Sequence, residues 1–189
     1  MSSFVAVYDA CVLYPAPLRD LLMHLALSGL YRARWSARIH EEWITALLRQ
    51  RPDLSREDLD WTRQQMDAAI PDCLVSGYEG LDAGLSLPDP NDHHVLAAAI
   101  LCRAGTSVTY NLKDFPDSAL APYGISAQHP DEFIGHAFDL SPAAICKTVR
   151  DQRASLKNPP RSVETLFDSD LQQGLATTVS ALREHAELL

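Results

Sequence analysis

The sequence predicts an α/β fold with a central parallel sheet of about five strands, flanked by helices and followed by further C-terminal helices. Short apolar runs alternate with longer helical patterns over residues 1–135, a pattern typical of parallel strands joined by helices. After Asp139 the chain has helix signals, a Pro-Pro break at 159–160 and no convincing strand. We therefore expect an α/β domain over residues 1–135 and a helical extension over residues 136–189.

The first part of the chain is expected to form two strands and two helices. Phe4–Tyr8, FVAVY, is a short apolar run typical of a buried strand. Pro17–Leu30 has helical apolar spacing, with a proline suited to the first turn and Gly29 near its end. Arg32–Ser36 is interpreted as a brief strand, and its last residue is suited to cap a helix over Ala37–Gln50.

The second part continues the alternation. The Ser55 and Asp58 pair resembles a capping box and predicts a helix that stops before Pro71. A helix over Pro88–Gly105, with its last glycine as the stop, is expected next. The remaining strands are expected at Cys73–Ser76, Thr106–Tyr110 and Gly124–Ala127.

Composition excludes several classes of protein. The chain of 189 residues is 47% hydrophobic and 22% charged, as in globular proteins, and no apolar run is long enough to span a bilayer. The N-terminal stretch MSSFVAVYDACVLYP has no basic leader, so we expect a cytoplasmic protein without a membrane partner. The four cysteines have no C-x-x-C spacing, which argues against a zinc site or a cysteine mechanism.

The formal charge of −9 argues against nonspecific binding of polyanions over the whole surface. A nucleic acid partner would need a local basic strip, for which Arg32, Arg34, Arg38, Arg49 and Arg51 are candidates. Solvated helix faces are the commoner explanation for such a scatter of arginines.

Four acidic residues stand where an α/β sheet gathers its ligands, namely beyond the carboxyl ends of the strands. Asp9 follows the first strand, Glu42 lies on the second helix, Asp92 opens a later helix and Asp114 follows the fourth strand. If they converge, each close pair repels by about 4 kcal/mol at about 4 Å and an effective dielectric of about 20. A divalent cation relieves this repulsion, and all-oxygen ligands favour Mg²⁺ or Mn²⁺.

Two of these acids, and three polar residues near them, also have structural explanations. Asp92 in a first helical turn is stabilised by the helix dipole wherever it lies, and Glu42 beside Glu41 is equally explained as a solvated charge. Asp89 before Pro90 is sufficiently explained as a helix cap. His93 and His94 point in different directions on a helix, so they cannot chelate one ion together.

The segments VYDACVLYP, SARIHEEWITALL and DPNDHHVLAAAILCRAGTSVTYNLKDFP, in this order, resemble the PIN-domain family of metal-dependent ribonucleases. The likeness is to its VapC-type toxins in particular, it covers about Phe4–Phe133, and no single motif in it is specific. It implies a PIN-like three-layer fold. It also implies that Asp9, Glu42, Asp92 and Asp114 form the catalytic metal site, with Thr109 and Asn111 as possible supporting residues.

The chain departs from the family pattern at two positions. Asn111 stands where many members have an acid, and it offers a carbonyl oxygen without charge. We therefore expect weaker divalent binding and leave open whether one metal ion or two are held. Cys11 stands where the family often has Asn, so we expect a side-chain hydrogen bond near Asp9 to be missing.

The resemblance implies an endoribonuclease toxin that uses Mg²⁺ or Mn²⁺, is inhibited by a small cognate antitoxin and forms a homodimer. Two alternatives remain. The Asn at 111 can mark a catalytically lapsed module that binds RNA or protein without cleavage. A phosphotransferase of the haloacid dehalogenase type also begins with a strand and an Asp, but it requires a second Asp where this chain has Cys11. The C-terminal helices could contact the antitoxin, a second copy, the RNA or only the core.

Overall fold

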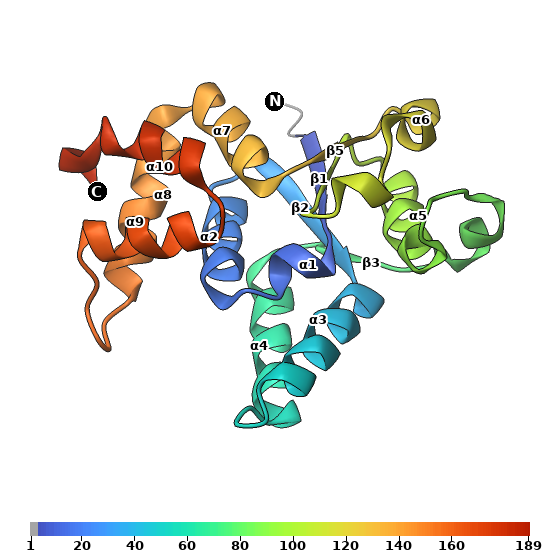
Figure 1. Cartoon of the computed structure of the whole chain (residues 1–189), viewed down its shortest axis with the longest axis horizontal. Coiled ribbons are helices and arrows are strands. Elements are labelled where there is room, and N and C mark those ends of the chain that lie inside the picture. The colour runs from blue at the N-terminus through green and yellow to red at the C-terminus, as the bar shows by residue number, and fades with distance from the viewer. Residues whose placement is uncertain (1–3) are drawn as a thin grey trace.

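The computed structural model describes residues 4–189 and confirms the predicted α/β fold with a parallel sheet (Figure 1). Residues 1–3, part of the stretch judged to lack a leader, lie outside the described residues. The five strands lie in the order β3-β2-β1-β4-β5, and every neighbouring pair is parallel. The strands are β1 Phe4–Tyr8, β2 Tyr31–Ser36, β3 Leu74–Val75, β4 Thr106–Val108 and β5 Ser126–Gln128.

Helices and short 3₁₀ turns connect and flank these strands. Up to β5 they are α1 Ala10–Leu13, α2 Ala16–Leu27, α3 Ala37–Gln50, α4 Arg56–Ala69, η1 Glu79–Gly84, η2 Pro90–Asp92, α5 His93–Leu101, η3 Leu112–Asp114, α6 Asp117–Leu120 and η4 Ala121–Tyr123. After β5 they are α7 Pro130–Leu140, α8 Pro142–Ser155, α9 Val163–Gln172, α10 Ala176–Arg183 and η5 Ala186–Leu188. No helix within residues 4–189 has both the length and the apolar character needed to cross a membrane.

The central strand β1 organises the core because it lies between two other strands and its last three residues are buried. Val7 and Tyr8 are fully buried, and β1 pairs with β2 on one edge and with β4 on the other. The buried Tyr8 hydroxyl donates to the Leu22 carbonyl of α2 at 3.2 Å and also hydrogen-bonds the Tyr31 hydroxyl of β2. Buried polar atoms need such partners, so these bonds fix the strand against its neighbours.

The helix expected over Pro88–Gly105 is shorter and begins differently. Asp89 accepts a hydrogen bond from the Asn91 N–H at 2.9 Å and caps the 3₁₀ turn η2, so Asp92 stands at the junction with α5 rather than in an α-helical turn. The helix ends at Leu101, and Arg103 instead of a glycine adopts the left-handed conformation, with φ of 55°. The Gly105 N–H bonds the Val5 carbonyl and leads into β4.

The C-terminal helices pack on one side of the sheet domain. Figure 1 shows α8 and α9 beside α2, with α10 next to α7 and α9, on the side of the molecule away from α5 and α6. Helix α7 crosses the expected boundary at residue 135 without interruption and contacts both α8 and α10. The expected Pro-Pro break at 159–160 lies between α8 and α9.

One carboxylate joins the extension to α7. The Asp131 oxygens accept hydrogen bonds from the Thr178 N–H at 2.8 Å and the Thr177 N–H at 2.9 Å. These are among the first N–H groups of α10, which have no partner within their own helix. Although partial burial alone would raise it, these two N–H groups lower the pKa of Asp131.

We predict that Asp131→Ala lowers the free energy of unfolding by about 1–2 kcal/mol, because it removes a helix cap. Since the pKa of Asp131 is lowered in the folded state, its contribution to the free energy of unfolding is present above about pH 4 and is lost as the pH falls further. Urea denaturation at several pH values measures both effects. Asp139→Ala, at an exposed position on the same helix, is the matched control. Equal stability of the two variants at pH 7 would refute the cap.

Candidate active site

The carboxyl ends of β1 and β4 meet at the point where the strand order reverses, because β2 and β3 extend from one side of β1 while β4 and β5 extend from the other. Ligands of open α/β sheets bind at such a point. Asp9 directly follows β1 and Thr109 directly follows β4. The Thr109 hydroxyl donates a 2.7 Å hydrogen bond to Asp9 Oδ2, so the two strand ends are joined through these side chains.

Asp9 is a buried carboxylate held by neutral donors. The residue is only 4% exposed. Its oxygens accept hydrogen bonds from the Ala10 N–H at 2.6 Å, the Thr109 hydroxyl at 2.7 Å and the Cys11 thiol at 3.1 Å. Within the described residues no Lys, Arg or His forms an ion pair with it. The negative charge of Asp9 is therefore oriented but not neutralised.

The expected loss of a hydrogen bond at Cys11 is corrected by this geometry. The thiol donates to Asp9, lies 3.3 Å from the Thr109 hydroxyl and accepts from the Tyr110 N–H at 3.3 Å. Burial, followed by the charge of Asp9, raises the pKa of Cys11 to about 12. The thiol thus stays protonated and is able to act as a donor to Asp9.

The two adjacent glutamates of α3 have different surroundings. Glu41 is exposed and forms a two-pronged ion pair with Arg56 of α4, at 2.9 and 2.7 Å. Glu42 instead faces α5, where its Oε1 lies 2.8 Å from His94 Nε2 and 3.4 Å from Arg38 Nε. Helix periodicity explains the divergence, since neighbours on a helix point about 100° apart.

His94 is a residue whose contact the sequence did not reveal. It is fully buried, and neither ring nitrogen has a partner with hydrogen-bond geometry within residues 4–189. The Glu42 carboxylate lies close to it, in an ion-pair contact. The available signal was its place on the buried face of an Ala-rich helix, where a polar ring needs a partner. Its neighbour His93 instead accepts the Leu87 N–H.

Asp92 lies among the other carboxylates. It stands at the start of α5 and makes no capping hydrogen bond with its side chain. Burial, followed by the charges of Asp9, Asp89, Asp114 and Glu42 in that order, raises the pKa of Asp92 to about 6. Each of these carboxylates is therefore near enough to disfavour ionisation of Asp92.

Charge and donor type fit a hard divalent cation, although the side chains are not closed around one. Within the described part of the chain, no three His, Cys, Asp or Glu side chains converge on a common metal position. Asp9, Asp92 and Asp114 nevertheless offer carboxylate oxygens without ion-pair partners there, which are the donors that Mg²⁺ and Mn²⁺ prefer. Asn111 is exposed, and its N–H donates to the Thr109 hydroxyl at 3.0 Å.

Comparison with known proteins agrees with the resemblance found in the sequence. Residues 130–184 match the family model described as the VapC50 C-terminal domain. A protein of Mycobacterium tuberculosis (strain ATCC 25618 / H37Rv) named "Putative ribonuclease VapC50" is 41% identical over 93 residues, 49% of this chain and 54% of that relative. The chain thus spans about half the length of the relative. No solved structure gives a significant match. The resemblance to VapC-type proteins with a C-terminal extension is confirmed.

We predict that Asp92→Asn stabilises the metal-free protein at pH 7 by about 1–2 kcal/mol, after discounting for solvent screening. The pKa of Asp92 is raised in the folded state, so wild-type stability should fall as the pH rises from about 4 to about 6, while the variant should not show this decline. Urea denaturation in EDTA measures both effects, with the exposed Asp117→Asn as control. A wild-type profile that matches Asp92→Asn would disprove the carboxylate repulsion.

Proposed function

We propose that this protein is a divalent-metal-dependent endoribonuclease, the toxin of a bacterial toxin–antitoxin pair. The observation that carries the proposal is the group of carboxylates around Asp92 at the strand ends, of which Asp9 is buried without an ion-pair partner among the described residues. The name of the relative as a ribonuclease supports the same class of reaction.

In this proposal Asp9, Asp92 and Asp114 hold Mg²⁺ or Mn²⁺, and Glu42 ligates it through water or orients the attacking water. An ion held there would supply Lewis-acid chemistry, by lowering the pKa of a water molecule and offsetting charge on the phosphodiester. Asp9 is preoriented for this role by the Thr109 hydroxyl and the Cys11 thiol. Hydrogen-bonded support of this kind fixes the direction of a ligand oxygen.

The remaining side chains at the site act on Glu42 and on the substrate. His94 supports the Glu42 carboxylate from the buried side at 2.8 Å, and Arg38 contacts the same oxygen from the exposed side. The Arg38 guanidinium is half-exposed and also reaches the Asn91 carbonyl at 3.3 Å. It is therefore suited to contact an RNA phosphate as the strand enters the site.

A catalytically lapsed module that binds RNA or protein is the second candidate. The observation that favours it is Asn111, an exposed amide in place of an acid, whose side chain makes no cap hydrogen bond in η3. In that case the carboxylates would bind divalent metal weakly or not at all.

Several further properties are part of the proposal. We expect an RNA substrate, a small cognate antitoxin, a homodimer and a cytoplasmic location, as the VapC likeness implies. Residues 1–135 would form the nuclease domain, and residues 136–189 the helical extension.

We predict that Asp9→Asn lowers metal-dependent cleavage of total cellular RNA by at least about two orders of magnitude. Glu42→Gln should also be strongly impaired, whereas Glu41→Gln should cut like the wild type, because Glu41 pairs with Arg56 away from the site. The assay compares Mn²⁺, Mg²⁺ and EDTA, with folding of each variant checked by circular dichroism. Full activity of Asp9→Asn would refute the assignment.

The response of the melting temperature to Mn²⁺ distinguishes the two candidates. A metal that binds the folded state raises this temperature through RT ln(1+[L]/Kd), so we predict a rise for the wild type and its loss in Asp92→Asn. A wild-type protein that neither cuts RNA nor responds to Mn²⁺ would favour the lapsed module.

A further inference from the structure

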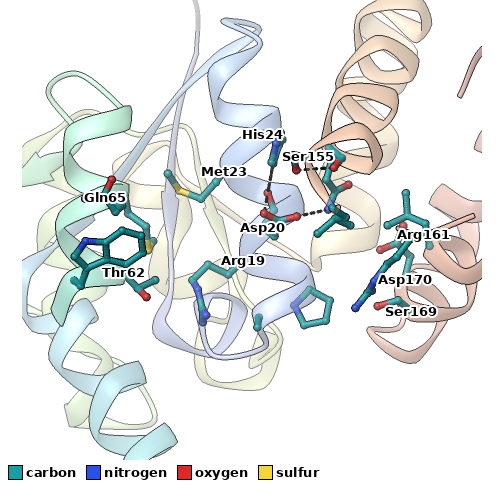
Figure 2. A pocket seen from close by; sticks show the side chains of 17 residues that line it. Arg19, Asp20, Met23, His24, Thr62, Gln65, Ser155, Arg161, Ser169 and Asp170 are labelled. Carbon is teal, nitrogen blue, oxygen red and sulfur yellow. Dashed lines mark hydrogen bonds and ion pairs between the residues drawn. The ribbon is translucent and has the colours of Figure 1, made fainter. Parts of the chain in front are cut away.

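A cavity of about 910 Å³ lies between the sheet domain and the C-terminal extension, apart from the carboxylates described above. Figure 2 shows its walls, which come from α2, α4, α8 and α9 and from the segment that joins α8 to α9. One side therefore belongs to the α/β domain, and the other lies within the region that matches the VapC50 C-terminal domain. Whatever fills this cavity touches both parts of the protein.

The cavity is lined by buried acceptor atoms that have no donor. Asp170 is only 1% exposed, and neither of its carboxylate oxygens has a hydrogen-bond partner within residues 4–189. Gln152 is 2% exposed, its Oε1 likewise lacks a partner there, and its Nε2 donates to Asp20 Oδ2 at 2.8 Å. Buried acceptors without donors are costly and rare in native proteins. Three such atoms on one cavity wall indicate a ligand that supplies N–H groups.

The charges at this position favour a cation. Burial, followed by the charge of Asp20, raises the pKa of Asp170 to about 7, so a second negative charge lies near enough to repel it. Both carboxylates line the cavity, with Asp20 on α2 and Asp170 on α9. A positive group bound between them would remove this repulsion and restore the ionised form of Asp170.

The two arginines on the cavity wall do not supply this charge. The Arg19 guanidinium donates to the Leu13 carbonyl at 2.6 Å and lies 4.7 Å from the centre of the Trp43 ring. Arg161 lowers the pKa of Asp170 from a distance, but within the described residues no ion pair joins them. The Asp170 oxygens are therefore buried without a charged partner among the described residues.

Apolar side chains form the rest of the wall. They include Met23 of α2, Trp61 of α4, Leu156 after α8 and Leu166 of α9, and the Trp61 side chain is 62% exposed. Such a surface is suited to cover a hydrocarbon stem, as pockets for organic ligands commonly do. A bare metal ion would leave this surface uncovered, and no three metal-ligating side chains converge in the described part of the chain.

We propose that this cavity binds a guanidinium group carried on a short aliphatic stem. The guanidinium has five N–H donors in a planar fork, which matches the free oxygens of Asp170 and Gln152 together with the charge of Asp20. The stem lies against Met23, Trp61 and Leu156. This site is independent of RNA cleavage, and its test reads binding to the full chain rather than activity.

Two probes distinguish the sources of such a group. Agmatine represents a free small molecule, and N-acetyl-arginine methylamide represents an arginine side chain of a polypeptide. Butylurea, which has N–H donors and a stem but no charge, is the neutral control. At about a hundredfold excess over Kd, the better charged probe should raise the melting temperature of the wild type by about 5–10 °C. Butylurea should produce no comparable rise.

Matched variants assign the effect to the cavity. Asp170→Asn should abolish the rise, while Asp168→Asn, at an exposed position of the same helix, should keep it. If Asp170→Asn does not fold, Asp20→Asn provides a second variant, because the Asp20 side chain is partly exposed. We expect Asp20→Asn to weaken binding at least tenfold, as measured by calorimetry. Arg161→Gln should bind the probe more tightly, because it removes a competing positive charge.

Three results would overturn the proposal. The first is that neither charged probe raises the melting temperature up to millimolar concentration. The second is an equal rise in melting temperature for the wild type, Asp170→Asn and Asp20→Asn. The third is loss of binding in Arg161→Gln. The last result would show that Arg161 is needed in the cavity rather than displaced from Asp170. The relative affinity of the two charged probes then identifies the source of the guanidinium.

Discussion

The buried carboxylate of Asp9 is the constraint on which the rest of the site depends. An ionised carboxylate in an apolar interior costs several kcal/mol unless donors or a cation compensate it. Here the compensation comes from the Ala10 N–H, the Thr109 hydroxyl and the protonated Cys11 thiol. These groups orient the charge without cancelling it. The strand order makes this possible, because β1 and β4 are neighbours whose carboxyl ends bring Asp9 and Thr109 together.

The same charge then acts on the neighbouring elements. Asp92 begins α5 without a capping bond, and burial together with the surrounding carboxylates raises its pKa. The helix geometry of α3 directs the Glu42 side chain away from that of Glu41, and His94 contacts the Glu42 carboxylate from the core side. The cavity beside α2 is a second position where a buried carboxylate lies near another one. There Asp170 is buried near Asp20 and has no hydrogen-bond donor among the described residues. In both places a buried carboxylate, Asp9 or Asp170, has no ion-pair partner among the described residues.

The sequence predicted the fold well because apolar strands and helical spacing are local signals. Helix Ala37–Gln50 begins and ends as predicted, since the Ser36 hydroxyl caps it at the Ile39 N–H. The start of α5 was not predicted, because the Asp89 side chain stabilises a tighter turn first. The contact of His94 with Glu42 and the role of Cys11 depend on packing between distant elements. Such contacts have no local signature, and neither has the cavity that α2 shares with α9.

The central claim is that the carboxylates around Asp92 need a divalent cation. Calorimetric titration of the metal-free protein with Mn²⁺ near pH 6, in two buffers of different ionisation enthalpy, tests it most directly. Because metal binding requires deprotonated ligands and Asp92 is partly protonated at this pH, binding should release protons, and Asp92→Asn should abolish both the binding and the release. Absence of binding heat in the wild type, or binding without proton release that Asp92→Asn leaves unchanged, would contradict this account.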